Sequence, residues 1–227
     1  MPATLRPKLV GCLFFLASSI GFCADDDKPP KPTAEQIKAV NMAFAKLGVE
    51  NPSSHRGVPM YTLPAGLTDA TLKKLPEVPF AFGLSISGGK VTDAGLKELK
   101  RHKYLASLDA VGTKVTDAGL KELKDLKFLT FLDLSGTKVT GAGLKDLKTI
   151  TYLGLNGTPT TDAGLRGLKN LEGLATIHLD KTAVTDAGMK ELAKSPSLVA
   201  VTVKQTAVTD GGVKALRDAR PKCEVSR

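Results

Sequence analysis

The side chains of this sequence that could do chemistry are two aspartates and a histidine–aspartate pair. Asp109 and Asp133 are separated by one repeat length, and His178 and Asp180 lie further along the chain. Two adjacent carboxylates can raise one another's pKa and so supply a general acid, and a His–Asp pair is a fragment of a metal site. Which chemistry is open to them depends on the elements that carry them.

Those elements come from a repeated segment, whose clearest copy is VTDAGLKELKDLKFLTFLDLSGTK at residues 115–138. Its Thr-Asp-Ala-Gly-Leu part has a helix N-cap and an acid for the first helical turn. The alternating leucines Leu132 and Leu134 then predict a short strand with both side chains inward, and Ser135-Gly136 predicts the turn after it. Units open at Leu67, Val91, Val115, Val139, Thr160, Val184 and Val208.

One unit is shorter than the others. The step from Val139 to Thr160 is 21 residues, whereas every other step is 24. Because the strand pattern is kept, we expect about one helical turn to be missing from the outer side of this unit. Repeats of this length predict a solenoid, in which each unit buries its apolar face only against its neighbours.

The pattern L-x-x-L-x-L-x-x-T resembles the leucine-rich-repeat signature, with threonine where many family members carry asparagine. The V-T-D-A-G-L continuation is similar to the subtype found in F-box receptors and in short secreted bacterial leucine-rich-repeat proteins. The resemblance covers residues 67–225 and implies an α/β solenoid, a right-handed arc with a parallel sheet on its concave face and helices on its convex face. The signature threonines are Thr113, Thr137, Thr158, Thr182 and Thr206.

Alternation along the predicted strands identifies the side chains of the concave face. Phe131 and Tyr152 should stand side by side, because neighbouring strands lie ~4.8 Å apart. Asp109 and Asp133 should also be neighbours, with His178 two strands beyond Asp133. The candidate binding residues of this face are Phe131, Tyr152, Asp109, Asp133, Asn156, His178 and Asp180.

This arrangement favours recognition over catalysis. Asp133 would lie ~10 Å from His178, which is too far for the two to share an ion, so solvated carboxylates and a surface histidine are the preferred interpretation. His55 and His102 are expected in a loop and at a helix end, away from the concave face. No phosphate-binding loop, G-x-S-x-G or H-E-x-x-H pattern occurs, and we predict no enzyme activity, metal or cofactor.

The residues before the array predict an exported protein. Residues 1–24 have the basic start and apolar run of a signal peptide, and residues 25–32 form an acidic, proline-rich tether. Within 33–66 we expect a helix, opened by a Thr33–Gln36 capping box, that covers the end of the array. A polar loop at 51–57 and an irregular edge strand at 58–63, containing Pro59, should follow.

The array with its C-terminal cap should occupy residues 67–227, and no segment after the leader is long enough to span a membrane. Cys223 and Val225 are expected at the two inward strand positions of a last, truncated unit. Only Cys223 remains once the leader is removed, so no internal disulfide can form.

The function expected from these features is that of a secreted or periplasmic protein-interaction module. Its partner would be another protein, bound on the concave face. The alternative is an anionic envelope polymer or glycan bound by the lysine-rich convex face, since the chain carries a net charge of +9. Nucleic acid is not expected, and an F-box-like ubiquitin adaptor is disfavoured because residues 1–66 leave no room for an F-box.

Overall fold

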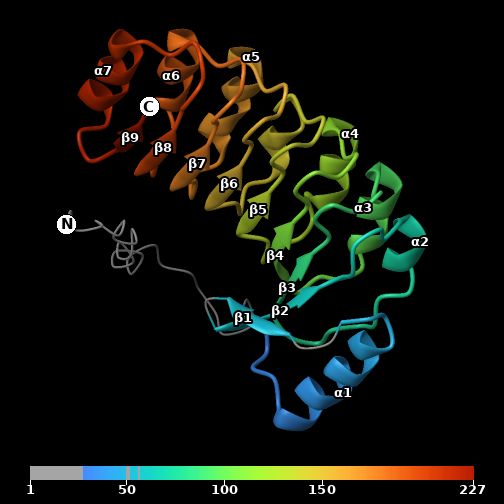
Figure 1. Cartoon of the computed structure of the whole chain (residues 1–227). Helices are drawn as coiled ribbons and strands as arrows, with labels where there is room; N and C mark the ends of the chain where they lie inside the picture. The colour runs from blue at the N-terminus through green and yellow to red at the C-terminus, as the bar shows by residue number, and fades with distance from the viewer. Residues whose placement is uncertain (1–27, 50–51, 56) are drawn as a thin grey trace, which may run out of the picture.

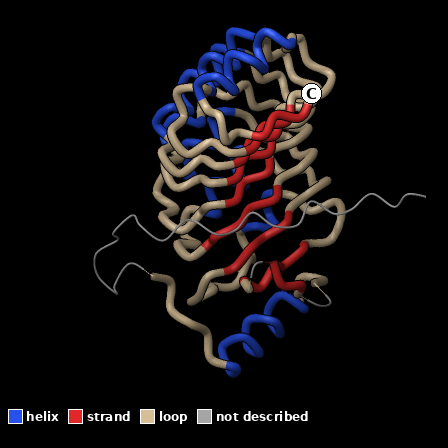
Figure 2. The backbone as a smooth tube through the Cα atoms, turned by 90° about the vertical axis from the view of Figure 1, so that its left-hand side faces the viewer, coloured by secondary structure: helices blue, strands red, loops and turns tan. Residues whose placement is uncertain are grey.

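A computed structural model describes residues 28–49, 52–55 and 57–227, and it shows a curved stack of repeats (Figure 1). The strands lie along the inner side of the arc and the helical segments along the outer side, as predicted from the repeat pattern. Figure 2 views the strands as one ladder, with the first helix at its N-terminal end. We number the repeats 1 to 7 by the seven opening residues given above.

In the described part of the chain the strands form a nine-stranded sheet in sequence order. Strands β2 to β9 pair in parallel, and β1 pairs antiparallel with β2. The strands are β1 (Ser53–His55), β2 (Val58–Thr62), β3 (Phe82–Ser85), β4 (Leu105–Asp109), β5 (Phe131–Asp133), β6 (Tyr152–Gly154), β7 (Thr176–His178), β8 (Ala200–Thr202) and β9 (Glu224–Ser226).

The outer side is built from short α-helices and 3₁₀ turns, because each repeat has room for only one or two helical turns. The α-helices are α1 (Ala34–Ala45), α2 (Asp69–Leu72), α3 (Asp93–Leu99), α4 (Asp117–Leu120), α5 (Asp162–Leu165), α6 (Asp186–Leu192) and α7 (Asp210–Ala219). The 3₁₀ segments are η2 (Lys121–Leu123), η3 (Leu144–Asp146) and η4 (Arg166–Asn170). Repeat 4, the short one, carries η3 alone, which confirms the missing helical turn.

The core is a set of leucine, valine and isoleucine layers between strands and helices. Leu132 and Leu134 are fully buried, and register places Leu132 between Leu108 of β4 and Leu153 of β6. All seven opening residues are buried as well, including the polar Thr160. Each layer is therefore covered by the next, so stability comes from the interfaces between repeats.

On the outer side, the aspartate of the T-D-A-G-L segment links neighbouring repeats. The Asp93 carboxylate accepts hydrogen bonds from Thr116 of the next repeat, at 2.8 Å from its backbone N–H and 2.7 Å from its hydroxyl. The same pair of bonds from the equivalent threonine of the next repeat is accepted by Asp69, Asp117, Asp162 and Asp186.

A glycine lies directly over four of these carboxylates, and at Asp117 the glycine lies against the backbone of the aspartate. A Cβ on Gly119, for example, would collide with Asp93, so glycine is required for this close approach. The sequence pattern predicted the threonine as the N-cap, and the structure confirms this role at Thr92, Thr116, Thr185 and Thr209. It did not predict that the aspartate would bond across the repeat junction.

The signature threonines act within their own repeat. The Thr137 hydroxyl donates to the Leu134 carbonyl at 2.6 Å, and the four other signature threonines make the equivalent bond three residues back. The turn before each of them needs a positive φ, which is 68° at Gly136. In the last two full repeats, Lys181 and Gln205 occupy that position with φ of 58° and 55°.

The N-terminal region differs from the predicted arrangement in one strand. Helix α1 has the predicted capping box, and Phe44 stacks on the buried Tyr61 of β2 with a ring-centroid distance of 3.9 Å. The prediction of a polar loop at 51–57 is wrong, because Ser53–His55 forms strand β1. His55 therefore lies in a strand. β2 is consequently not an edge strand, and Pro59 pairs with Ser54 of β1.

The C-terminal register also differs from the prediction. Val225 pairs with Val201 and occupies the first inward position, but Cys223 precedes β9. The position equivalent to Leu134 belongs to Arg227, whose guanidinium instead lies 3.0 Å from Asp210. Cys223 is nevertheless buried, and burial raises the pKa of its thiol to about 11.

The signal peptide predicted at residues 1–24, and the start of the tether, lie outside the described residues. Residues 28–32 of the tether form no helix or strand. Among the described residues, no helix has the length and apolar composition needed to cross a membrane.

Candidate functional site

The concave face carries all seven residues predicted to bind, and each of them is half-buried. Register confirms the predicted columns, since Ser107, Phe131, Tyr152 and Thr176 are successive partners across four strands. Asp109 and Asp133 are direct neighbours, and His178 lies two strands beyond Asp133.

The centre of the face is an aromatic row. The rings of Phe131 and Tyr152 are parallel within 6°, with centroids 4.2 Å apart. Tyr152 in turn contacts the imidazole of His178, with a centroid distance of 5.2 Å. The row follows from register, because the three residues occupy equivalent or adjacent concave positions on β5, β6 and β7, and cross-strand aromatic pairs stabilise a sheet.

The two neighbouring aspartates are held by serines. Ser85 and Ser87 donate their hydroxyls to the Asp109 carboxylate. Asp133 accepts from both the backbone N–H and the hydroxyl of Ser135 through the same oxygen, Oδ1, at 2.9 and 2.6 Å. These bonds fix the carboxylates in orientation.

Asn156 and Asp180 have a structural contact besides any role in binding. The Asn156 side-chain oxygen accepts from the backbone N–H of Asp180 at 2.8 Å, and Asp180 accepts from the N–H of Lys204 at 2.7 Å. The two side chains therefore link the turns that follow β6, β7 and β8.

No metal site is formed by these groups. In the described ranges, no cluster of three histidine, cysteine or acidic side chains could hold an ion. His178 contacts the Thr202 hydroxyl at 3.3 Å. His102 lies away from the face, as predicted, where burial and then the neighbouring Arg101 lower its pKa to about 4.

The sequence did not reveal a hollow at the N-terminal end of the concave face. It has a volume of about 250 Å³, and Ser54, Met60 and Ser107 line it together with Asp109, Asp133 and Phe131. Gly83 leaves the space that the Met60 side chain occupies, because a Cβ there would collide with the Met60 sulfur. The signal that could have indicated this hollow is the pair of small residues, Gly83 and Ser107, before Phe131 in one column.

Comparison with known proteins supports the fold. A family model described as "Leucine Rich repeat" matches residues 126–148. The chain has a leucine-rich-repeat fold. A comparison with curated protein sequences finds no significant match.

Among solved structures, this chain is similar to two internalins of Listeria monocytogenes. Internalin C2 superimposes with a TM-score of 0.57 at 20% identity, over 86% of this chain and 93% of the internalin. The internalin InlF gives a TM-score of 0.56 at 20% identity, over 71% of this chain. The match spans 47% of the InlF chain, about half its length. At this identity the likeness shows the fold.

Proposed function

We propose that this leucine-rich-repeat protein is an exported, non-catalytic interaction module that binds another protein on its concave face. The observation that carries the proposal is the stacked Phe131–Tyr152 pair near the middle of the sheet. Aromatic side chains surrounded by polar groups are where binding energy concentrates in protein interfaces. Here Asp109, Asp133 and Asn156 form that polar surround.

The backbone supports recognition because it holds these side chains in fixed positions. Each concave column is a row of neighbouring residues on hydrogen-bonded strands, and the polar members are bonded to their neighbours. Little side-chain entropy is then lost when a partner binds. The repeat architecture also favours an extended partner, because curved solenoids offer long concave surfaces.

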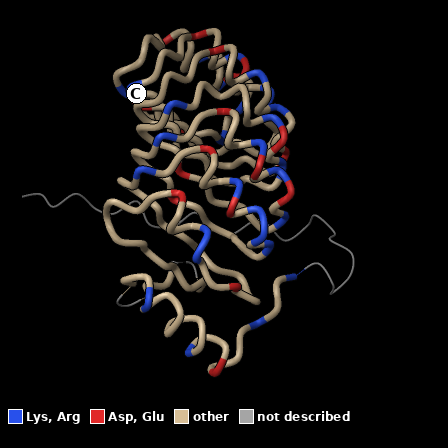
Figure 3. The backbone as a smooth tube through the Cα atoms, turned by 90° about the vertical axis from the view of Figure 1, so that its right-hand side faces the viewer, with Lys and Arg blue, Asp and Glu red and all other residues tan. Residues whose placement is uncertain are grey.

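The convex alternative receives less support. Basic and acidic residues are interspersed along the outer side (Figure 3), and the Lys100 ammonium lies 3.8 Å from the Asp125 carboxylate. The Arg101 guanidinium already donates hydrogen bonds to the backbone carbonyls of Leu72, Lys73 and Leu75 at the end of α2. These contacts favour the concave face over a glycan or other anionic polymer on the convex side.

Export is proposed from the sequence of residues 1–24, and it places the protein in the periplasm or outside the cell. An extracellular or envelope protein is then the class of partner to search for.

The experiment is affinity capture from envelope extracts with three forms of the exported chain. These are the native sequence, Phe131→Ser with Tyr152→Ser, and Lys121→Glu with Lys145→Glu. For a protein captured specifically by the native chain, the aromatic double variant should lower the affinity at least about tenfold, and the lysine variant should leave it unchanged. Circular dichroism and thermal unfolding check first that all three forms fold.

The opposite result would reject the concave face. If the captured protein binds the aromatic variant normally and no longer binds the lysine variant, the convex side is the working surface. Its binding should then also weaken steeply as salt is raised, because exposed charges are screened.

A further inference from the structure

The hollow beside Phe131 has features of a site for one specific kind of side chain. It lies where β1 and β2 fold against the N-terminal end of the concave sheet, so its lining comes from both parts. Its volume of about 250 Å³ is below that of sites for drug-sized ligands and suits a single side chain.

The hollow is acidic within a basic protein. Asp109 and Asp133 lie on neighbouring strands, and among the residues that the structure describes no lysine or arginine lines the space. The chain as a whole has 32 basic and 23 acidic residues, so this local charge opposes the overall charge. A cation is therefore the ligand that the electrostatics favour.

The aspartates retain capacity to accept further hydrogen bonds. The two hydrogen bonds that Ser135 donates to Asp133 both reach Oδ1, and the carboxylate lies over Gly154, where a Cβ would collide with it. The serines that bond Asp109 hold its carboxylate in place. Each carboxylate oxygen can accept more than one donor, which leaves room for an ammonium or a guanidinium.

A buried hydroxyl gives independent evidence for a ligand. Ser107 is 8% exposed, and its Oγ makes no hydrogen bond to the described protein atoms. An unpaired buried hydroxyl costs free energy, so natural proteins seldom keep one without a use. Ser107 lines the hollow on the same strand as Asp109, so the unpaired hydroxyl belongs to a wall of this hollow.

The remaining walls suit the apolar part of a basic side chain. Phe131 presents an aromatic ring, which attracts cations. Met60 has a flexible thioether side chain that can move aside or cover an alkyl stem. A bare metal ion is a poor fit, since the described residues contain no group of three metal-ligating side chains.

We propose that this hollow receives a lysine or arginine side chain of the protein partner. The ammonium or guanidinium would lie between Asp109 and Asp133, with its alkyl stem against Phe131 and Met60. The inference rests on the proposed function, because it names the chemistry by which the concave face selects its partner.

The test is an NMR titration of the labelled protein with N-acetyl-lysine-methylamide, and separately with the arginine analogue. N-acetyl-norleucine-methylamide, which has a similar stem without the charge, is the control ligand. The charged probes should shift the amide resonances of residues 107–111 and 131–135 in a saturable way, and norleucine should not. The double variant Asp109→Asn with Asp133→Asn should weaken this binding at least tenfold.

Asp162→Asn is the control protein. It also removes a carboxylate that accepts a backbone N–H, but on the outer side and away from the hollow, so binding of the charged probes should be unchanged. Equal shifts with norleucine would overturn the proposal, and so would binding that survives in the Asp109/Asp133 variant. If neither charged probe shifts these resonances at 50-fold excess over protein, the proposal is overturned as well.

The outcome is separable from that of the proposed function. A captured partner that depends on Phe131 and Tyr152 but not on Asp109 and Asp133 would keep the concave interface and reject the basic-side-chain site. A partner that depends on the convex lysines alone would reject both.

Discussion

The junction between repeats 4 and 5 differs from the other junctions of the array. Between repeats 2 and 3, Lys114 N–H donates to the Val91 carbonyl at 2.8 Å, and Asp93 adds its two bonds to Thr116. Between repeats 4 and 5 the first donor is lost because Pro159 has no N–H, and the carboxylate is lost because Gly141 replaces the aspartate.

Two other contacts take their place. The Thr160 hydroxyl donates to the Val139 carbonyl at 3.4 Å. At the other junctions the equivalent carbonyl accepts from a backbone N–H. Gly141 and Gly164 let the two backbones touch, since a Cβ on Gly164 would come within 3.0 Å of Gly141 Cα. The stacking of repeats can therefore be stabilised either by side-chain hydrogen bonds or by close backbone packing. Substitutions should distinguish the two kinds of junction.

The largest effect should come from Gly164→Ala at the exceptional junction. The added methyl would collide with the Thr140 carbonyl oxygen, which belongs to the backbone and can move little. We expect a loss of about 3 kcal/mol in the free energy of unfolding, measured by urea denaturation. Gly173→Ala is the control, because its Cβ would meet only Thr151 Cγ2 at 3.7 Å. Equal stability of both variants would show that the two backbones are not in close contact.

A smaller loss should follow Asp117→Ala at the junction between repeats 3 and 4. This carboxylate accepts from Thr140 and also from the N–H groups of Gly141 and Gly143, at 3.1 and 2.9 Å. We expect a loss of about 2–3 kcal/mol, compared with about 1–2 kcal/mol for Asp93→Ala, whose carboxylate accepts two hydrogen bonds from Thr116.

The pH dependence of stability gives a second measurement on Asp117. Burial alone would raise the pKa of its carboxyl, but hydrogen bonds from Gly143, Thr140 and Gly141 hold that pKa below its ordinary value. Its contribution is therefore present above the ordinary carboxyl pKa and is lost as pH falls through the lowered one. Asp117→Ala should reduce the acid dependence of the unfolding midpoint, and an unchanged dependence would contradict the assignment.

The smallest of the three effects should come from Thr160→Val. The change removes the hydroxyl that donates to Val139, while keeping a shape that the sixth repeat already uses at Val184. We expect a loss of about 1 kcal/mol. Amide hydrogen exchange should also become faster in the residues around Thr160 than around Val184, and uniform exchange along the array would argue that the junction is not weaker.

The fold was largely predictable because its pattern is periodic. Apolar residues recur at the Leu132 and Leu134 positions in every full repeat, so one correct register places all of the concave columns, including the Phe131–Tyr152 stack. The short step from Val139 to Thr160 was readable for the same reason. Periodicity converts a single local inference into several independent checks.

The rest could not be read from the pattern for physical reasons. Strand β1 is polar and three residues long, so it has no apolar alternation to indicate pairing. The Asp93–Thr116 bond crosses from one repeat to the next, and a repeated motif does not reveal whether its polar groups bond within the unit or between units. The hollow depends on where Met60 lies, which side-chain packing decides.

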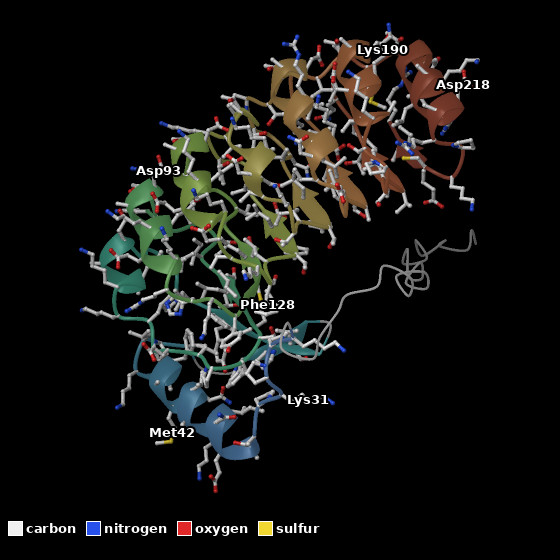
Figure 4. All side chains as sticks on the ribbon, turned by 180° about the vertical axis from the view of Figure 1, so that it is seen from behind. Lys31, Met42, Asp93, Phe128, Lys190 and Asp218 are labelled. Carbon is white, nitrogen blue, oxygen red and sulfur yellow. The ribbon has the colours of Figure 1, made fainter. Side chains whose placement is uncertain are left out.

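The row of aspartate–threonine bonds on the outer side has a mechanical consequence. Asp93 lies on this outer side (Figure 4), where stretching is greatest when a curved body is bent further. These hydrogen bonds connect successive repeats on the outer side. Because Gly141 replaces the aspartate, the junction between repeats 4 and 5 should resist bending less than the others. When the array bends, most of the deformation occurs at the least stiff junction, which is the one between repeats 4 and 5, behind β6 and β7. The curvature of the protein should therefore adjust beside Tyr152, where a bound partner would press.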